Sequence, residues 1–154
     1  MNTTKQSRVS MVMIRTMENL AFIDKHKTDE GPYETTQLVN SFLGALAHPW
    51  EDLRREFKKM SIKVAVNNGW PLVEKQLPTD VEPRNLDDLI RLMRNGLAHR
   101  GIELLPRGDC EIEAIHIVNV DPKCGHRTWG TVLKVEDVRT FLDKFVATAR
   151  LLSR

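Results

Sequence analysis

The sequence predicts a mainly α-helical fold: an antiparallel bundle of about four to five helices with one β-hairpin before a C-terminal helix. Apolar residues recur every three to four positions over most of the chain, as they do along helices that bury one face. β-branched residues dominate two short runs between residues 112 and 135, and turn-forming clusters separate the segments. With 154 residues and 41% hydrophobic content, the chain is expected to form a single domain over residues 1–154.

The charges of the chain are nearly balanced, at 23 basic and 21 acidic residues. A net charge of +2 gives no overall basic surface, so nucleic-acid binding would have to come from local clusters of basic side chains. Because the sequence lacks an apolar run long enough to cross a membrane and a signal peptide at its start, we expect a cytoplasmic protein. Cys110 and Cys124 are then expected to be reduced thiols without a disulfide.

A first helix is predicted over residues 7–25, with apolar residues on two sides. One face carries Val9, Val12, Met13, Thr16, Leu20 and Ile23, and the other carries Met11, Ile14 and Phe22. Such a helix either packs on the core and on a neighbouring subunit, or is central and buried all round. Residues 29–32 break the chain. A second helix follows, with apolar positions Leu38, Val39, Phe42, Leu43 and Leu46.

Residues 48–60 are compatible with two interpretations. Pro49 suits the first turn of a third helix running to about Met60, with acidic residues early and basic residues late, as the helix dipole prefers. It equally suits a kink in one long helix. A turn at residues 67–71 and an irregular connection over residues 77–84 lead to a further helix that starts near Asn85.

The β-hairpin is predicted from residues 112–120 and 128–135, which are rich in β-branched side chains. Residues 121–125 between them have the composition of a turn. The last segment is an amphipathic helix to the C-terminus, with Val138, Phe141, Leu142, Phe145, Ala149 and Leu152 on one stripe.

The segment Arg94-Asn95-Gly96-Leu97-Ala98-His99 sets polar side chains on a strongly amphipathic helix. The apolar stripe of that helix, which should face the core, consists of Leu86, Leu89, Ile90, Met93 and Leu97. Arg91, Asn95 and His99 form a row opposite the stripe, so they should point away from the core. Arg94 lies on the flank, and its long side chain can bring the guanidinium to the polar row.

An arginine, an amide and a histidine on an exposed helix are the groups needed to cleave a phosphodiester without a metal. Imidazoles have a pKa of about 6.5 in peptides, so near neutral pH they can take a proton from an attacking hydroxyl and return one to a leaving oxygen. Arg94 could stabilise the charge that builds on the phosphate, and Asn95 could orient His99 or the scissile group. Arg91 and Arg100 would add phosphate contacts that position RNA without reading its sequence.

Residues 94–99 match the pattern R-X4-6-H, with a polar residue directly after the arginine, that marks HEPN domains. The order of elements also resembles that family, most closely the small HEPN proteins encoded on bacterial plasmids. The resemblance implies a HEPN-like domain and a homodimer whose two motif helices meet across a cleft. It implies a metal-independent endoribonuclease, without a cofactor, that leaves a cyclic phosphate end. By the same resemblance Arg94 and His99 are catalytic and Asn95 supports them.

HEPN proteins commonly act as toxins or in defence against phage, and the resemblance implies such a role here. The alternative is a non-catalytic HEPN module that binds a partner protein, nucleotide or RNA, for instance one half of a pair with an antitoxin or a nucleotidyltransferase. A third hypothesis is a helical dimerisation protein with an inert polar groove. From the residues alone, the polar row also fits a solvated helix face with His99 near a helix C-terminus, where a positive charge is favoured.

Gly96 has two consequences for this helix. It loosens the helix by about 1 kcal/mol relative to alanine. It also lets another backbone come close, and a partner backbone there would suit a dimer.

Other chemically capable residues have ordinary explanations. His116, Cys124 and His126 are a metal-like grouping, but they lack the paired spacing of a structural zinc site, so we predict no metal. The hairpin tip carries Lys123, His126 and Arg127, which could touch RNA or be solvated turn residues. Trp50, Trp70 and Trp129 are too scattered for a base-stacking platform and are expected in the core or at its rim. Three acidic residues could tether Arg94 or His99, namely Glu18, Glu51 and Asp52. Surface positions are the simpler expectation for all three.

Overall fold

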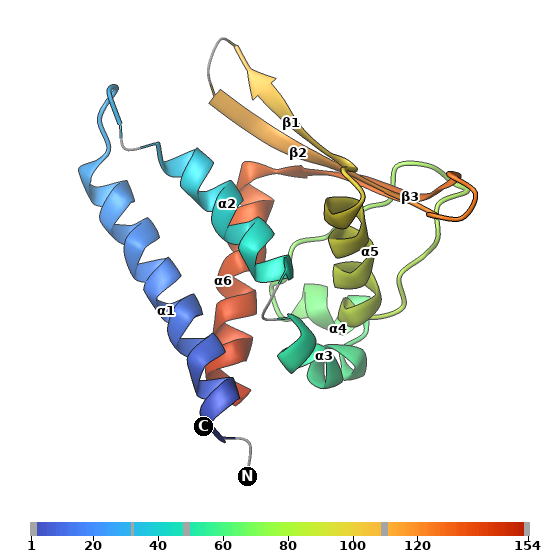
Figure 1. The fold of residues 1–154 in the computed structure, drawn as a ribbon, viewed down its shortest axis with the longest axis horizontal. Coiled ribbons are helices and arrows are strands. Elements are labelled where there is room, and N and C mark those ends of the chain that lie inside the picture. The colour runs from blue at the N-terminus through green and yellow to red at the C-terminus, as the bar shows by residue number, and fades with distance from the viewer. Residues whose placement is uncertain (1–2, 32, 48–49, 109–110, 153–154) are drawn as a thin grey trace.

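The computed structural model describes residues 3–31, 33–47, 50–108 and 111–152. Within these ranges the chain forms six helices and one three-stranded antiparallel sheet (Figure 1). The helices are α1 (Thr3–His26), α2 (Glu34–Ala47), α3 (Trp50–Lys59), α4 (Ile62–Asn67), α5 (Leu86–Ala98) and α6 (Val135–Leu152). The strands are β1 (Ile102–Arg107), β2 (Glu111–Val120) and β3 (Arg127–Lys134).

Helices α1, α2 and α6 pack against one another, and the sheet lies across one end of this group (Figure 1). Helix α5 packs on β2, α2 and α3, and it stands on the far side of α2 and α6 from α1. Helix α5 is therefore held by the sheet and by two helices, whereas α1 is held mainly by α2 and α6.

The mainly helical fold and the hairpin before the last helix are confirmed, and β2 and β3 form that hairpin. The sheet has one strand more than predicted, because β1 pairs antiparallel with β2. Strand β1 is short and contains Pro106, where the register shifts, so it lacks the uninterrupted alternation that marks a strand. The helix count also exceeds the prediction, because residues 50–67 form two short helices. Residues 48 and 49, where a break or a kink was expected, lie outside the described residues.

The core is built around the aromatic side chains of α6. Phe141 packs edge-on against Phe42 of α2 and Trp70, with ring centroids 5.5 and 5.1 Å apart. Phe145 lies 5.4 Å from Phe57 of α3, and all five rings are buried. These contacts join α2, α3 and α6. Among the tryptophans, Trp70 and Trp129 are core residues, as predicted, and the side chain of Trp50 lies outside the description.

Helix α1 contacts the core with one side only. Met13 and Leu20 are buried, whereas Met11, Val12 and Phe22 are 47%, 61% and 62% exposed. The interpretation of α1 as a helix buried all round is therefore wrong for its described side chains. Among the described residues, none of the helices is both long and apolar enough to span a membrane.

The C-terminal end of α5 lies directly on β2. Gly96 is buried, and a Cβ there would sit 2.7 Å from Ile117 Cγ2 and 3.0 Å from the Val118 carbonyl oxygen. The Gly101 N–H donates to the Gly96 carbonyl at 2.7 Å, and the Val118 N–H donates to the Gly101 carbonyl at 2.7 Å. The backbone that approaches Gly96 thus belongs to the same chain, so this glycine is not the dimer contact that the sequence suggested.

We predict that Gly101→Ala lowers the free energy of unfolding by about 2 kcal/mol, because the new Cβ overlaps the Val118 carbonyl and pushes the end of α5 off β2. Gly44→Ala is the matched control, since its Cβ meets no atom within 4 Å and alanine is the better helix former. Urea unfolding of both variants makes the test. Equal stability of the two variants would contradict the close packing of α5 on β2.

Candidate functional site

Helix α5 is fixed at its start by a side-chain cap. The Asn85 side chain accepts a hydrogen bond from the Asp88 N–H at 2.9 Å. Asp88 in turn accepts from Arg84 Nε at 3.1 Å and lies 3.5 Å from Arg91 Nη2. Burial raises the pKa of Asp88, but the hydrogen bonds from Arg84 outweigh it and hold the pKa below its usual value. The predicted phosphate ligand Arg91 is thus exposed but ion-paired to Asp88.

The buried face of α5 is turned slightly from the predicted stripe. Leu86, Leu89, Ile90 and Met93 are buried as expected. Leu97 is only half-buried, and the residues that join the buried face instead are Asp87, Leu92 and Gly96. The stripe is displaced because β2 covers the side of the helix that carries Gly96. Helical periodicity within α5 carries no information about that strand.

The polar residues of the motif lie on the last turn of α5 and just beyond it. Arg94 and Asn95 are half-buried, and His99 is exposed. The helix ends at Ala98, so His99 is the C-cap residue, and its N–H donates to the Asn95 carbonyl at 3.0 Å. The outward position of His99 agrees with the sequence prediction, although the residue lies one step past the helix.

The chain leaves α5 through a Schellman turn. The Arg100 N–H donates to the Leu97 carbonyl at 3.3 Å, and the Gly101 N–H donates to the Gly96 carbonyl. Arg100 has φ 60°, and within the part of the chain that the structure describes it is the one non-glycine residue with positive φ. Glycine normally takes this position, because a side chain there costs about 1–2 kcal/mol. The fold therefore holds an exposed arginine, directly after His99, at an energetic cost.

These residues lie close together along the backbone at one helix end. Arg94, Asn95, His99 and Arg100 belong to a single turn and its cap, and Arg91 lies one turn earlier. Guanidinium groups can bind phosphate oxygens, and an exposed imidazole can move a proton. Because the last turn is hydrogen-bonded to β2 through Gly101, the backbone of this set is fixed before any ligand arrives.

The three basic residues predicted at the hairpin tip have different environments. Lys123 and His126 are exposed, as solvated turn residues or RNA contacts would be. Arg127 is half-buried and donates to the two carboxylate oxygens of Asp80, from Nε at 2.9 Å and from Nη2 at 2.7 Å. The Arg127 guanidinium thus joins β3 to the connection before α5.

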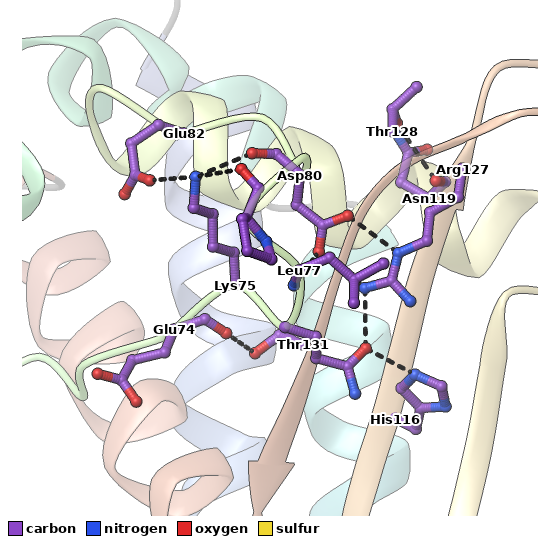
Figure 2. Close-up of polar contacts among 12 residues, drawn as sticks. Glu74, Lys75, Leu77, Asp80, Glu82, His116, Asn119, Arg127, Thr128 and Thr131 are labelled. Carbon is purple, nitrogen blue, oxygen red and sulfur yellow. Dashed lines mark hydrogen bonds and ion pairs between the residues drawn. The ribbon is translucent and has the colours of Figure 1, made fainter.

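The network around Asp80 was missed by the sequence analysis. Arg127 Nη2 also donates to Gln76 Oε1 at 3.0 Å, and the same oxygen lies 3.0 Å from His116 Nε2 on β2 (Figure 2). Asp80 is buried, and the hydrogen bond from Arg127 lowers its pKa below the usual value. Gln76 and Asp80 lie in an irregular segment without periodicity, so only the folded chain places them near β2 and β3.

The other candidates from the sequence lie apart from the motif or outside the description. Among the side chains described, no three of His, Cys, Asp and Glu are grouped so that they could hold a metal ion. Cys124 is an exposed free thiol, and Cys110 lies outside the described residues. Glu18 is exposed on α1, and the side chains of Glu51 and Asp52 are likewise outside the description.

Comparison with known proteins gives one family. The sequence profile of the family described as HEPN pEK499 p136 matches residues 1–150. No curated protein and no solved structure matches the chain. The match covers the motif, the sheet and nearly all of the helices.

We predict that Arg100→Gly raises the free energy of unfolding by about 1 kcal/mol, because glycine relieves the positive φ of the Schellman turn. Arg91→Gly, in the regular part of the same helix, should lower it by about 1 kcal/mol. Urea denaturation compares the two variants. A loss of stability in both would mean that the Arg100 side chain supports the fold and is not held there at a cost.

A second prediction concerns acid stability. Because the folded-state pKa of Asp80 is lowered, its carboxylate stabilises the fold above the unfolded pKa of about 3.9, and this contribution is lost as the pH falls below that value. Wild-type protein should therefore lose stability more steeply below about pH 4 than Asp80→Asn does. The exposed Asp29→Asn serves as control and should follow the wild type. Parallel curves for wild type and Asp80→Asn would contradict the role of the Arg127 pair.

Proposed function

The chain belongs to the HEPN pEK499 p136 family, and from this premise we propose that it is a metal-independent endoribonuclease whose site is the end of α5. HEPN domains are commonly ribonucleases, and the R-X4-6-H pattern of the family corresponds here to Arg94 and His99. The observation that carries the proposal is the placement of these residues, with Asn95, on a helix end that β2 anchors.

In the proposed reaction a ribose 2′-hydroxyl attacks the adjacent phosphorus. The new O2′–P bond forms, the P–O5′ bond breaks, and the products end in a cyclic phosphate and a 5′-hydroxyl. A neutral His99 takes the proton of the 2′-hydroxyl, and a protonated His99 gives one to O5′. Arg94 stabilises the charge on the phosphate oxygens, Asn95 orients the reacting groups, Arg91 holds a neighbouring phosphate, and Arg100 makes a further contact to the bound RNA.

A homodimer is part of this proposal. One cleft with two copies of His99 would supply both the proton acceptor and the proton donor. Such a cleft requires the C-terminal ends of two α5 helices to meet. The exposed apolar side of α1 lies beyond α2 and α6 from α5, so it would serve a different contact.

That apolar side favours a second candidate function, a HEPN module that binds a partner protein. Met11, Val12 and Phe22 are exposed there, and a groove runs between α1 and α2 past Met13 and Gly44. An antitoxin or a nucleotidyltransferase would be such a partner. We place the protein in the cytoplasm, with a role as a toxin or in defence against phage, in either case.

Cleavage of RNA in the presence of EDTA tests the first proposal. Wild-type protein should cut single-stranded RNA and leave cyclic phosphate ends. His99→Ala and Arg94→Ala should each lower the cleavage rate at least about 100-fold, because proton transfer and charge stabilisation are each worth that much. The rates are measured from the initial accumulation of labelled fragments.

His26→Ala is the matched control, since His26 is an exposed histidine at the end of α1, far from α5 in the helix packing. Its cleavage rate should equal that of wild type. Thermal unfolding of all the variants separates a lost site from a lost fold. Equal cleavage by wild type and His99→Ala, or no cleavage by the wild type, would reject the catalytic proposal and leave the partner-binding module.

A further inference from the structure

A depression of about 190 Å³ lies on the sheet beside the motif, where α5 turns into β1. Its lining consists of Arg100, Gly101, Ile102, Glu103, His116 and Val118. We propose that this depression binds a guanine base of the RNA. The inference rests on the proposed function, because the motif would bring the RNA backbone to this edge of the sheet.

Arg100 supplies the first contact of the proposed guanine site. It directly follows His99, so a nucleotide next to the scissile phosphate is within the reach of its side chain. Its backbone takes a conformation that favours glycine, with φ 60°, and no feature of the Schellman turn requires an arginine there. Strained positions that persist in a fold are concentrated at functional sites. Binding of a base by Arg100, which lines the depression, would be such a function.

Glu103 supplies the second contact, and a chain of polar contacts leads from buried Asp80 to its exposed side chain. Buried Asp80 fixes the Arg127 guanidinium, which donates to Gln76 Oε1 (Figure 2). Because arginine only donates, the Gln76 atom is the amide oxygen, and His116 Nε2 must therefore donate to the same oxygen at 3.0 Å. His116 Nδ1 lies 3.4 Å from Glu103 Oε2, and it donates to that oxygen when the ring carries protons on both nitrogens. In that form His116 is a positioning residue between the network and Glu103.

Gly130 leaves the space that this chain of contacts needs. A Cβ on Gly130 would lie 2.9 Å from Gln76 Oε1 and against the Arg127 guanidinium. The Gln76 N–H also donates to the Gly130 carbonyl at 2.9 Å, so backbone and side chain of Gln76 are both fixed to β3. The ring of His116 is therefore held on the surface of the sheet before a ligand binds.

The pairing of donor and acceptor groups selects guanine among the four bases. Arginine only donates, and guanine offers it two adjacent acceptors, O6 and N7. A carboxylate only accepts, and guanine offers it two adjacent donors, N1–H and the N2 amino group. Adenine, cytosine and uracil lack that pair of donors. The half-buried side chain of Val118, on the same face of β2 as His116, gives the base an apolar surface, and the His116 ring can stack on the base.

The test measures binding of 2′-O-methyl oligonucleotides, which wild-type protein cannot cleave. One guanine within a uridine oligonucleotide is replaced by adenine, cytosine, uracil, inosine or 7-deazaguanine. Each replacement should weaken binding about tenfold or more, because inosine lacks the N2 amino group and 7-deazaguanine lacks N7. Glu103→Gln should remove the difference between guanine and inosine, and Arg100→Gly the difference between guanine and 7-deazaguanine.

The control is Glu113→Gln, an exposed carboxylate of β2 outside the depression, which should keep the full preference for guanine. Equal affinity for all the oligonucleotides, or an inosine effect that persists in Glu103→Gln, would overturn the inference. Cleavage without a guanine preference would overturn it and leave the proposed function standing. Guanine-specific binding by a protein that cleaves no RNA would support the guanine site and reject the proposed ribonuclease activity.

Discussion

The contact between the end of α5 and β2 is the constraint on which the rest of the site depends. Gly96 and Gly101 bring the two backbones together, because a Cβ on Gly101 would collide with the Val118 carbonyl and a Cβ on Gly96 with the Ile117 side chain. The hydrogen bond from the Val118 N–H to Gly101 makes the contact directional. Since close-packed backbones leave no room for rotation of the last helical turn, this contact determines that His99 lies outside and Gly96 inside.

The two faces of β2 make different contacts. On the inner face Ile117 packs against α5, and on the outer face His116 contacts Gln76, which Arg127 and Asp80 hold in turn. The proposed catalytic end of α5 and the proposed base site are therefore attached to the same strand. Arg100 stands between them, at a backbone position whose cost suggests that its side chain is needed.

Patterns within single elements could be read from the sequence, and contacts between elements could not. The buried residues Leu86, Leu89, Ile90 and Met93 follow from helical periodicity, as does the apolar stripe of α6. The displaced face of α5 depends on β2, which begins only after β1. Strand β1 directly precedes β2 but was missed, because Pro106 and the register shift there interrupt its alternation. Asp80 offered no pattern at all, because its partner Arg127 is 47 residues away. For residues 94–99, the sequence predicted polar side chains that could act on RNA. The strained backbone of Arg100 could be seen only in the folded chain.

The central claim is that RNA binds at the end of α5, with its phosphates at His99. The most direct test follows the ring resonances of the five histidines by NMR while 2′-O-methyl RNA is added. If RNA binds there, the His99 ring resonances shift until the protein is saturated, while those of His26 at the end of α1 stay unchanged. Unchanged His99 resonances would contradict binding at the end of α5. This holds whether the RNA shifts the resonances of His126 at the hairpin tip or those of no histidine.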